Sequence, residues 1–252
     1  MGALPGQQLT LVDCTLRDGG YCNNWQFDRK TAYCLVRDLS RSGVNIIEVG
    51  YKAPPIHRPN GFEGLFRYCT ESQLSFLRHF SCEYAFMIDA KEYIEHGRAS
   101  PSLVRACTVP ARESPFSWVR IATVYDHLQV ALDLVPIFRE LGYRVTINLM
   151  QLALLSEQLA TEAFERCARS PIDVLYIADS FGNMMAPLLE KTVRCIREVY
   201  AGAIGFHAHD NMGLAFANTL KAIDLGITFI DCTVTGMGWQ TFHRTAKQDK
   251  NL

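Results

Sequence analysis

Eight short runs rich in Val, Ile, Leu and Phe recur along the chain, separated by stretches in which apolar residues return every three or four positions. The runs cover residues 9–14, 45–50, 84–89, 118–123, 145–149, 174–178, 204–208 and 229–234. They are apolar at most positions rather than at alternate ones, which is typical of strands buried on both faces. The pattern therefore predicts eight strands of a parallel sheet.

Stretches with helical periodicity lie between most of these runs. Asp28 is a candidate N-cap near the start of the first, and Gly43 stands where a helix commonly ends. Ser156 is a second capping candidate. The predicted helices cover residues 27–42, 126–141, 156–169, 187–200, 214–225 and, less regularly, 60–80. Residues 90–115 contain three prolines and are expected to form short helices and loop.

Strands that alternate with helices over this length predict a (β/α)8 barrel, that is, an α/β TIM barrel. A doubly wound open sheet is the main rival. That fold would be expected to carry a glycine-rich phosphate-binding turn after the first strand. The turn here is Arg17-Asp18-Gly19-Gly20, which lacks that spacing.

Polar residues fall at the carboxyl ends of the predicted strands, where such barrels carry their chemistry. His207 and His209 are two positions apart, so on a strand both imidazoles point to the same face. Two neutral imidazoles on one face can bind a single metal ion. The first strand is expected to end near Arg17 and Asp18, and Asp18 completes a ligand set if the two strand ends meet. A turn or N-cap role is the alternative for Asp18, and a hydrogen-bonded core role for the histidines.

Further polar residues are expected at the same rim. Glu48, in the second run, either contacts the substrate or forms an ion pair with Arg17 or a lysine. The candidates for substrate contact end the fifth, sixth and eighth runs: Asn148, Asp179 and Thr233. For Asp179, as for Asp89, capping a turn or supporting a metal ligand is the alternative to direct contact.

One carboxylate and two imidazoles leave positions open on an octahedral ion such as Mn2+ or Mg2+, which we expect here ahead of Zn2+ or Co2+. A 2-oxo acid could chelate that ion, which would stabilise negative charge while a carbon–carbon bond forms or breaks beside the carbonyl. Arg17 would donate charge-assisted hydrogen bonds to the same oxygen. A general base is still needed to move a hydroxyl proton.

The composition narrows the classes of binding partner that the protein is expected to have. The chain of 252 residues is 48% hydrophobic and 20% charged, and its formal net charge is -1, so nothing indicates nucleic acid or an acidic membrane. It has no apolar run of about 18 residues and no secretory pattern at the N-terminus, so we expect a cytoplasmic protein. Its nine scattered cysteines are expected to be buried thiols, with a catalytic or zinc-bound cysteine as the alternative.

Four segments carry a resemblance to a known family: residues 15–19 (TLRDG), 46–50 (IIEVG), 178–182 (ADSFG) and 206–214 (FHAHDNMGL). In this order they resemble the metal-dependent TIM-barrel aldolases, lyases and synthases of the hydroxymethylglutaryl-CoA lyase-like superfamily. That group includes 4-hydroxy-2-oxovalerate aldolase, hydroxymethylglutaryl-CoA lyase, isopropylmalate synthase and homocitrate synthase. The resemblance covers residues 9–238 and is strongest to the oxovalerate aldolase branch, through residues 211–218.

The resemblance implies a role for several residues. Those that match the family's metal ligands are Asp18, His207 and His209. Arg17 matches the arginine that stabilises the enolate, and Glu48 matches an acidic residue that serves the chemistry in some members. Tyr21 stands where the oxovalerate aldolases place a catalytic histidine. A phenol, with an ordinary pKa of about 10, is a poor base at neutral pH, so we expect Tyr21 to donate a hydrogen bond or relay a proton.

The expected protein is therefore a carbon–carbon lyase that uses a divalent metal ion and acts on a 2-oxo acid and an aldehyde. We expect a homo-oligomer, and the resemblance adds a dehydrogenase partner that receives the aldehyde. A Claisen-type synthase or lyase using an acyl-CoA is the first alternative, and would need a basic patch or a further domain for the nucleotide. A degenerate barrel serving as a non-catalytic binding or scaffold subunit is the second.

The predicted single domain covers residues 1–252, with an atypical tail over residues 239–252. That tail is polar and has no apolar period, so we expect the barrel to lack a normal eighth helix. The outer faces of the first and eighth strands would then be open. Uncovering several hundred square ångströms at ~25 cal/mol per Å2 would cost about 5–10 kcal/mol, so a second chain is expected to cover the gap or the protein to be marginally stable.

Overall fold

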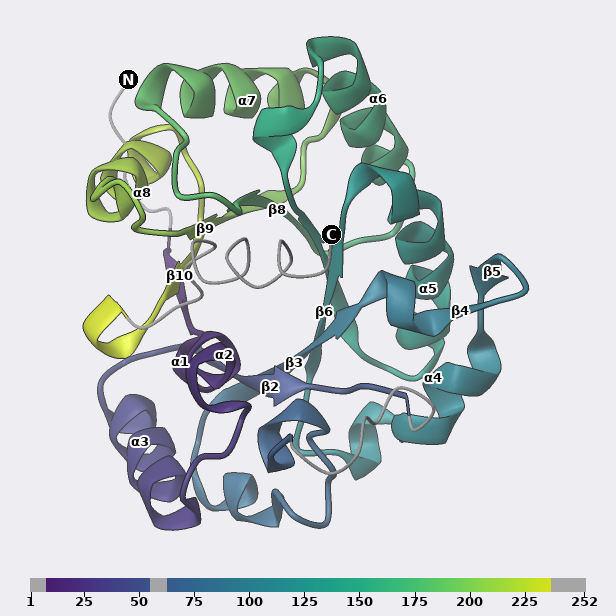
Figure 1. The fold of residues 1–252 in the computed structure, drawn as a ribbon, viewed down its shortest axis with the longest axis vertical. Helices are drawn as coiled ribbons and strands as arrows, with labels where there is room; N and C mark the ends of the chain where they lie inside the picture. The colour runs from purple at the N-terminus through teal and green to yellow at the C-terminus, as the bar shows by residue number, and fades with distance from the viewer. Residues whose placement is uncertain (1–7, 55–62, 237–252) are drawn as a thin grey trace, which may run out of the picture.

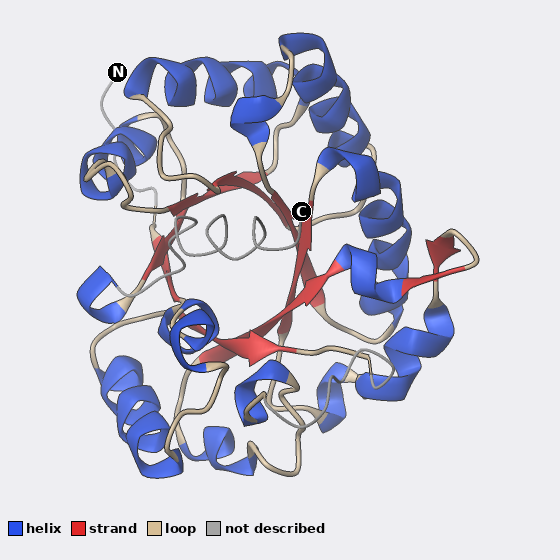
Figure 2. Cartoon of the chain, viewed as in Figure 1, coloured by secondary structure: helices blue, strands red, loops and turns tan. Residues whose placement is uncertain are grey.

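The computed structural model describes residues 8–54 and 63–236. Eight parallel strands close into a barrel in the order β1-β10-β9-β8-β7-β6-β3-β2, with helices around the outside (Figures 1 and 2). The strands are β1 (Thr10–Asp13), β2 (Ile46–Tyr51), β3 (Glu83–Asp89), β6 (Trp118–Thr123), β7 (Arg144–Leu149), β8 (Val174–Asp179), β9 (Ala203–Ala208) and β10 (Phe229–Cys232). The predicted (β/α)8 barrel is confirmed, and the open doubly wound sheet is excluded.

The strand sequences explain the two layers of the core. Every residue of β2, β6 and β8 is buried, because one face of each strand points into the barrel and the other meets the helices. Inside the barrel, Val12, Ile46, Ala85, Trp118 and Tyr176 pack together as a cluster separate from the larger core between strands and helices. The interior is therefore filled with side chains below the rim that carries the polar residues.

Five longer helices confirm predicted ones, with the expected small differences at their ends. They are α3 (Arg29–Arg41), α5 (Leu128–Glu140), α6 (Glu157–Ala168), α7 (Ala186–Val199) and α8 (Ala215–Asp224). Both predicted N-caps are present, since the side chain of Asp28 accepts from the Thr31 amide and that of Ser156 from the Leu159 amide. Gly43 has φ +90°, a left-handed conformation that glycine adopts without strain after a helix.

The turn after β1 differs from the prediction. The strand ends at Asp13, one residue before the end of its predicted run. The expectation that it reaches close to Arg17 and Asp18 is wrong, because two single-turn helices follow, α1 (Thr15–Asp18) and α2 (Gly20–Asn23). The Asp13 carboxylate accepts from the Thr15 amide at 3.0 Å and from its hydroxyl at 2.8 Å, which turns the chain out of the strand. Arg17 and Asp18 are therefore presented by a helical turn above the strand.

The second and third crossovers are irregular. The α-helix predicted over residues 60–80 is wrong for residues 63–80, which form the 3-10 turns η2 (Leu65–Arg67) and η3 (Ser75–His79). The third crossover was predicted as short helices and loop. It contains 3-10 turns at Ala90–Tyr93 and Ala111–Glu113, the short helix α4 (Pro101–Cys107) and an unpredicted hairpin of β4 (Ile94–Glu95) and β5 (Arg98–Ala99).

After β10 the described chain ends in the 3-10 turn η8 (Val234–Gly236). The predicted tail, residues 239–252, and the question of an eighth helix lie outside the described residues. Among the helices that the structure does describe, none has the length and apolar character needed to cross a membrane. All nine cysteines are free. The expectation that they are buried is confirmed for Cys14, Cys69 and Cys167 and wrong for the exposed Cys22 and Cys232, and the other four are partly buried.

Candidate metal site

Asp18, His207 and His209 meet at the carboxyl rim of the barrel. Asp18 comes from α1 after β1, and the histidines come from the end of β9; both strands neighbour β10. One ligand atom from each of the three side chains lies within 4.8 Å of the others. The shortest approach is 3.3 Å, between His207 Nε2 and Asp18 Oδ2. The convergence predicted from the sequence is therefore present in the structure.

Hydrogen bonds set the orientation of both imidazoles. His207 Nδ1 donates to Asp231 Oδ2 at 2.7 Å, and His209 Nδ1 donates to the backbone oxygen of Asp179 at 2.8 Å. With the proton on Nδ1, each ring keeps a lone pair on Nε2. His207 Nε2 is buried and makes no hydrogen bond with any described residue. This is the arrangement that supports a metal-bound histidine, because the bond on the far nitrogen fixes the tautomer.

Burial keeps His209 uncharged. Desolvation and then the neighbouring His207 lower its pKa to about 4, so the imidazole is neutral at physiological pH. A neutral imidazole is the form that binds metal. The three donors, one carboxylate and two imidazoles, therefore fit a divalent cation.

The arginine beside the site belongs to an ion-pair network. The Arg17 guanidinium pairs with the carboxylate of Asp18, and its Nε donates to Glu48 Oε2 at 2.6 Å. Glu48 is fully buried and also forms an ion pair with Arg120, in which Oε2 lies 3.0 Å from Nη1. Of the two roles considered for Glu48, the structure shows the ion pair with Arg17, and Glu48 lies between two guanidinium groups.

Arg120 and Asp231 were missed in the sequence. Arg120, in β6, donates from Nη2 to Asp231 Oδ2 at 2.5 Å, and the same oxygen accepts from His207. Burial favours the neutral form of Asp231, but the charge of Arg120 and the hydrogen bond from His207 hold its pKa well below the usual range. The signal that could have found both residues is a charge inside an apolar run, since a buried charge needs a partner.

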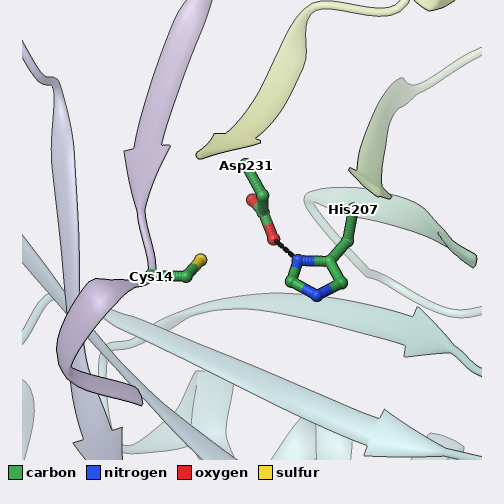
Figure 3. A group of neighbouring side chains, drawn as sticks. All are labelled: Cys14, His207 and Asp231. Carbon is green, nitrogen blue, oxygen red and sulfur yellow. Dashed lines mark hydrogen bonds and ion pairs between the residues drawn. The ribbon is translucent and has the colours of Figure 1, made fainter. Parts of the chain in front are cut away.

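A second group of potential ligands, Cys14, His207 and Asp231, lies next to the first (Figure 3). Figure 3 shows the Asp231 carboxylate bonded to one ring nitrogen of His207, with the Cys14 sulfur facing the pair. Arg120 Nη1 donates to Cys14 Sγ at 3.2 Å, so a guanidinium cation already lies against this group. Burial raises the pKa of the Cys14 thiol well above its usual value. In this group Asp231 is already engaged by Arg120 and His207, so its carboxylate serves to orient His207.

Tyr21 lies near the site but not among the three potential ligands. Its hydroxyl is 2.8 Å from that of Tyr51 at the end of β2. Burial raises the pKa of Tyr21, which keeps the phenol protonated at neutral pH. The residue is therefore a hydrogen-bond donor under ordinary conditions.

The three candidates for substrate contact lie in different settings. Asn148 is buried and accepts from the Thr146 hydroxyl at 2.6 Å. Asp179 accepts from the amides of Asn183 and Met184 at 3.1 and 3.2 Å, so its carboxylate holds the turn after β8, the alternative considered for it. Asp89 likewise caps a turn, through the Lys91 amide. Substrate contact by Asn148 and Asp179 stays a prediction.

Thr233 shares a groove with the potential ligands. The groove is lined by Asp18, His207, His209 and Thr233, and its empty volume of about 1210 Å3 includes open solvent. Its apolar wall includes Ala208, Ala215 and Phe216. Among the described residues no lysine or arginine lines this groove.

A closed parallel barrel with one carboxylate and two imidazoles at its carboxyl rim defines a TIM barrel with a candidate divalent-metal site. The sequence profile of the HMGL-like family matches residues 8–245. The chain belongs to this family, which confirms the resemblance carried by the four sequence segments.

Curated relatives cover most of this chain. A 4-hydroxy-2-oxovalerate aldolase of Geobacillus genomosp. 3 is 29% identical over 93% of this chain and 67% of its own length. An oxaloacetate decarboxylase of Mycobacterium tuberculosis is 26% identical, over 90% of this chain and 65% of its own length. The chain thus spans about two thirds of the length of the curated relatives it matches.

Solved structures agree on the fold. The N-terminal domain of a Bacteroides vulgatus protein described as a candidate aldolase has a TM-score of 0.79 at 28% identity, and the match covers 96% of this chain and 80% of that one. An HMG-CoA lyase from Bacillus subtilis has a TM-score of 0.72 at 15% identity and covers 96% and 81%. The carboxyl transferase domain of Rhizobium etli pyruvate carboxylase, at 15% identity, has a TM-score of 0.73 and covers 94% and 42%. The last two show the fold alone.

Proposed function

We propose that this chain forms the barrel of a divalent-metal-dependent carbon–carbon lyase that acts on 2-oxo acids, of the 4-hydroxy-2-oxo acid aldolase type. The observation that carries the proposal is the convergence of Asp18, His207 and His209, with both histidines hydrogen-bonded through Nδ1. A core histidine satisfied in another way would not leave its buried Nε2 without a hydrogen bond among the described residues, as His207 does, with the Asp18 carboxylate 3.3 Å away.

In this proposal Asp18, His207 and His209 hold the ion, with Mn2+ or Mg2+ preferred over Zn2+ or Co2+. When bound, the ion supplies a Lewis acid that lowers the energy of negative charge on the keto oxygen of a 2-oxo acid. Arg17, held by Glu48 and Asp18, donates hydrogen bonds to the same oxygen. Glu48 acts by fixing the direction of that guanidinium.

Tyr21 serves as the donor or relay for the proton of the substrate hydroxyl. As a relay, Tyr21 accepts the substrate proton while its own proton passes to the Tyr51 hydroxyl, which gives up one proton to water as the final acceptor, so that both phenols end neutral. Asn148, Asp179 and Thr233 are proposed substrate contacts, and Thr233 is supported by its place in the same groove as the three potential ligands. The substrates are a 2-oxo acid and an aldehyde.

Family membership also supports a proposal about the location, oligomeric state and partner of the protein. We propose a cytoplasmic homo-oligomer with one barrel domain, and a dehydrogenase as the partner that takes the aldehyde. The curated 4-hydroxy-2-oxovalerate aldolases support the substrate class. The groove opposes an acyl-CoA substrate, because its described lining offers no cation to the nucleotide phosphates.

The test is release of pyruvate from 4-hydroxy-2-oxo acids by chelator-treated protein, with and without added Mn2+. We expect activity with Mn2+ and none after chelation. His207→Ala is expected to abolish the activity, whereas His79→Ala, at the far surface turn η3, leaves it unchanged. Activity that survives both the chelator and His207→Ala would overturn the proposal.

Decarboxylation of oxaloacetate is a second candidate for the same site. It is favoured by the M. tuberculosis relative, and it also breaks a carbon–carbon bond next to a 2-oxo acid. It needs no proton transfer from a substrate hydroxyl, so Tyr21→Phe would leave it unaffected while slowing an aldolase. Assaying both substrates with that variant separates the two candidates.

A further inference from the structure

Six side chains form a closed ring around the interior of the rim. Arg120 contacts Asp231, Asp231 contacts His207, and His207 approaches Asp18. From Asp18 the ring continues through Arg17 and Glu48 back to Arg120. Two of its members, Asp18 and His207, are proposed metal ligands. Arg120 contacts neither proposed ligand, since each path from it around the ring passes first through a carboxylate, Asp231 or Glu48.

The net charge of this ring favours binding of a cation first, and the bound cation would then favour binding of an anion. It contains two guanidinium groups and three carboxylates, so it carries one net negative charge when His207 is neutral, as a ligand must be. A divalent cation would reverse that sign, and the site could then accept an anionic 2-oxo acid. Removing either arginine would leave a surplus of buried negative charge, which is costly away from water.

Arg120 is built into the barrel rather than onto its surface. Its side chain is 2% exposed, its guanidinium lies 4.4 Å from the centre of the Tyr176 ring, and it contacts Cys14 as well as the two carboxylates. β6 lies across the closed barrel from the strands that flank the site, β1, β10 and β9. Arg120 therefore joins one wall of the barrel to the side chains that orient ligands on the other.

We propose that Arg120 is a positioning residue for the metal site, which orients His207 through Asp231 and Arg17 through Glu48. The inference rests on the proposed function, because it requires that Asp18 and His207 bind the ion. Arg120 itself makes no contact with the metal or substrate in this proposal. Its effect on metal affinity passes mainly through Asp231, since this carboxylate bonds directly to a ligand.

The test measures Mn2+ binding to chelator-treated protein by calorimetry, together with circular dichroism of each variant. Arg120→Met is expected to weaken Mn2+ binding about 10–100-fold, the range found when the partner of a metal-bound histidine is lost, and Arg120→Lys to weaken it less. Arg144→Met is the matched control, since Arg144 is a strand arginine that pairs with Glu83 and stacks on Trp118 away from the site. It is expected to bind Mn2+ like the unmodified protein.

A double-variant cycle gives a readout that a purely structural role would not move. Asp231→Asn keeps the shape of the carboxylate but loses its charge, and alone it is expected to weaken Mn2+ binding about 10–100-fold. If Arg120 acts through Asp231, adding Arg120→Met to Asp231→Asn weakens binding little further. The double variant also loses one buried charge of each sign, and it serves as the measured protein if Arg120→Met alone fails to fold. In that case Arg120→Lys takes the place of the single arginine variant: a loss of Mn2+ affinity in Arg120→Lys together with equal affinities of the double variant and Asp231→Asn supports the proposal, whereas a further loss in the double variant contradicts it.

Two results overturn the inference, and they can be told apart. Normal Mn2+ affinity in folded Arg120→Met, or strictly additive losses in the cycle, would refute the role of Arg120 and leave the proposed function standing. Absence of Mn2+, Mg2+, Zn2+ and Co2+ binding by the unmodified protein would refute the proposed function and the inference together.

Discussion

The two histidines differ in the acceptor that each one meets. His207 donates to the carboxylate of Asp231, whereas His209 donates to a neutral backbone carbonyl. A carboxylate acceptor makes an imidazole the more basic ligand. We therefore expect His207 to contribute more to metal affinity than His209, although the two are only two positions apart on one strand.

The hydroxyl of Tyr21 is a single group whose role a substitution can test. Replacing Tyr21 by Phe removes the hydroxyl that bonds to Tyr51 but keeps the ring that packs edge-on against Trp25. If the hydroxyl relays the substrate proton, kcat for aldol cleavage falls about 100-fold with little change in KM, because general acid–base help is lost only in the transition state. Steady-state kinetics on a 4-hydroxy-2-oxo acid measure this.

Tyr33→Phe is the control for that experiment, since Tyr33 lies partly exposed on α3 and packs against Phe80. It is expected to keep both kinetic constants. Unchanged kcat in Tyr21→Phe would show that the hydroxyl takes no part in the proton transfer.

The three potential ligands could be assigned a role from the sequence, whereas Arg120 and Asp231 could be recognised only as charges in apolar runs, without a role. Asp18, His207 and His209 have donor side chains at strand ends, and spacing alone puts both histidines on one face. Arg120 stands in the middle of an apolar strand, so the sequence shows only that its charge needs a partner. Which carboxylates supply it depends on the closure of the barrel, which brings β6 opposite β10.

At the scale of elements, the turn between β1 and α1 holds an unusual carboxyl. Asp13 is 1% exposed, and burial raises its pKa from 3.8 to about 6 even though Thr15 donates two hydrogen bonds to it. A folded-state pKa above the unfolded value favours folding at low pH. This contribution is complete below the unfolded pKa and is lost as the pH rises through the folded one.

Asp13→Asn is therefore expected to remove this pH dependence. Relative to the unmodified protein, the variant should gain about 2 kcal/mol in free energy of unfolding as the pH rises from about 4.5 to about 7. Urea denaturation at both pH values measures the difference. Asp38→Asn is the control, because Arg37 lowers the pKa of exposed Asp38 and the sign is opposite. No change in the relative stability of Asp13→Asn between the two pH values would contradict the prediction.

Elements with strong apolar patterning could be predicted, and weakly patterned ones could not. All eight barrel strands lie within a residue or two of their predicted bounds, because burial on both faces leaves an unbroken apolar run. Residues 63–80 also contain apolar residues, but Phe66 and Leu77 are buried from 3-10 turns rather than from a helix. In the turn after β1, side-chain bonds made by Asp13 outweigh the tendency to continue the strand.

At the scale of the whole molecule, the candidate site lies where the barrel closes. β1 pairs with β10 from Thr10↔Phe229 to Asp13↔Cys232, and β10 pairs with β9 through only two register positions. The site connects the turn after β1 with β9, across β10. The number of strands, their order along the chain and the closed barrel could be predicted, but the register of the closing strands depends on contacts between residues more than two hundred positions apart.

An ion held by Asp18, His207 and His209 would tie the first strand to the seventh, so its binding should stabilise the closed barrel as a whole. Ligand binding to the folded state alone adds about 2.7 kcal/mol to the free energy of unfolding at a concentration 100 times the dissociation constant. We therefore expect Mn2+ to raise the melting temperature of chelator-treated protein by several degrees, and EDTA to reverse the change. β1 and β10 pair in parallel next to the site. The free energy of the opening that permits hydrogen exchange at the backbone amides of Thr10–Asp13 should therefore rise by a similar amount. Both effects should be absent in His207→Ala and present in the control His79→Ala. If Mn2+ leaves the melting temperature of the unmodified protein unchanged, the prediction of an ion bound between the two strands is wrong.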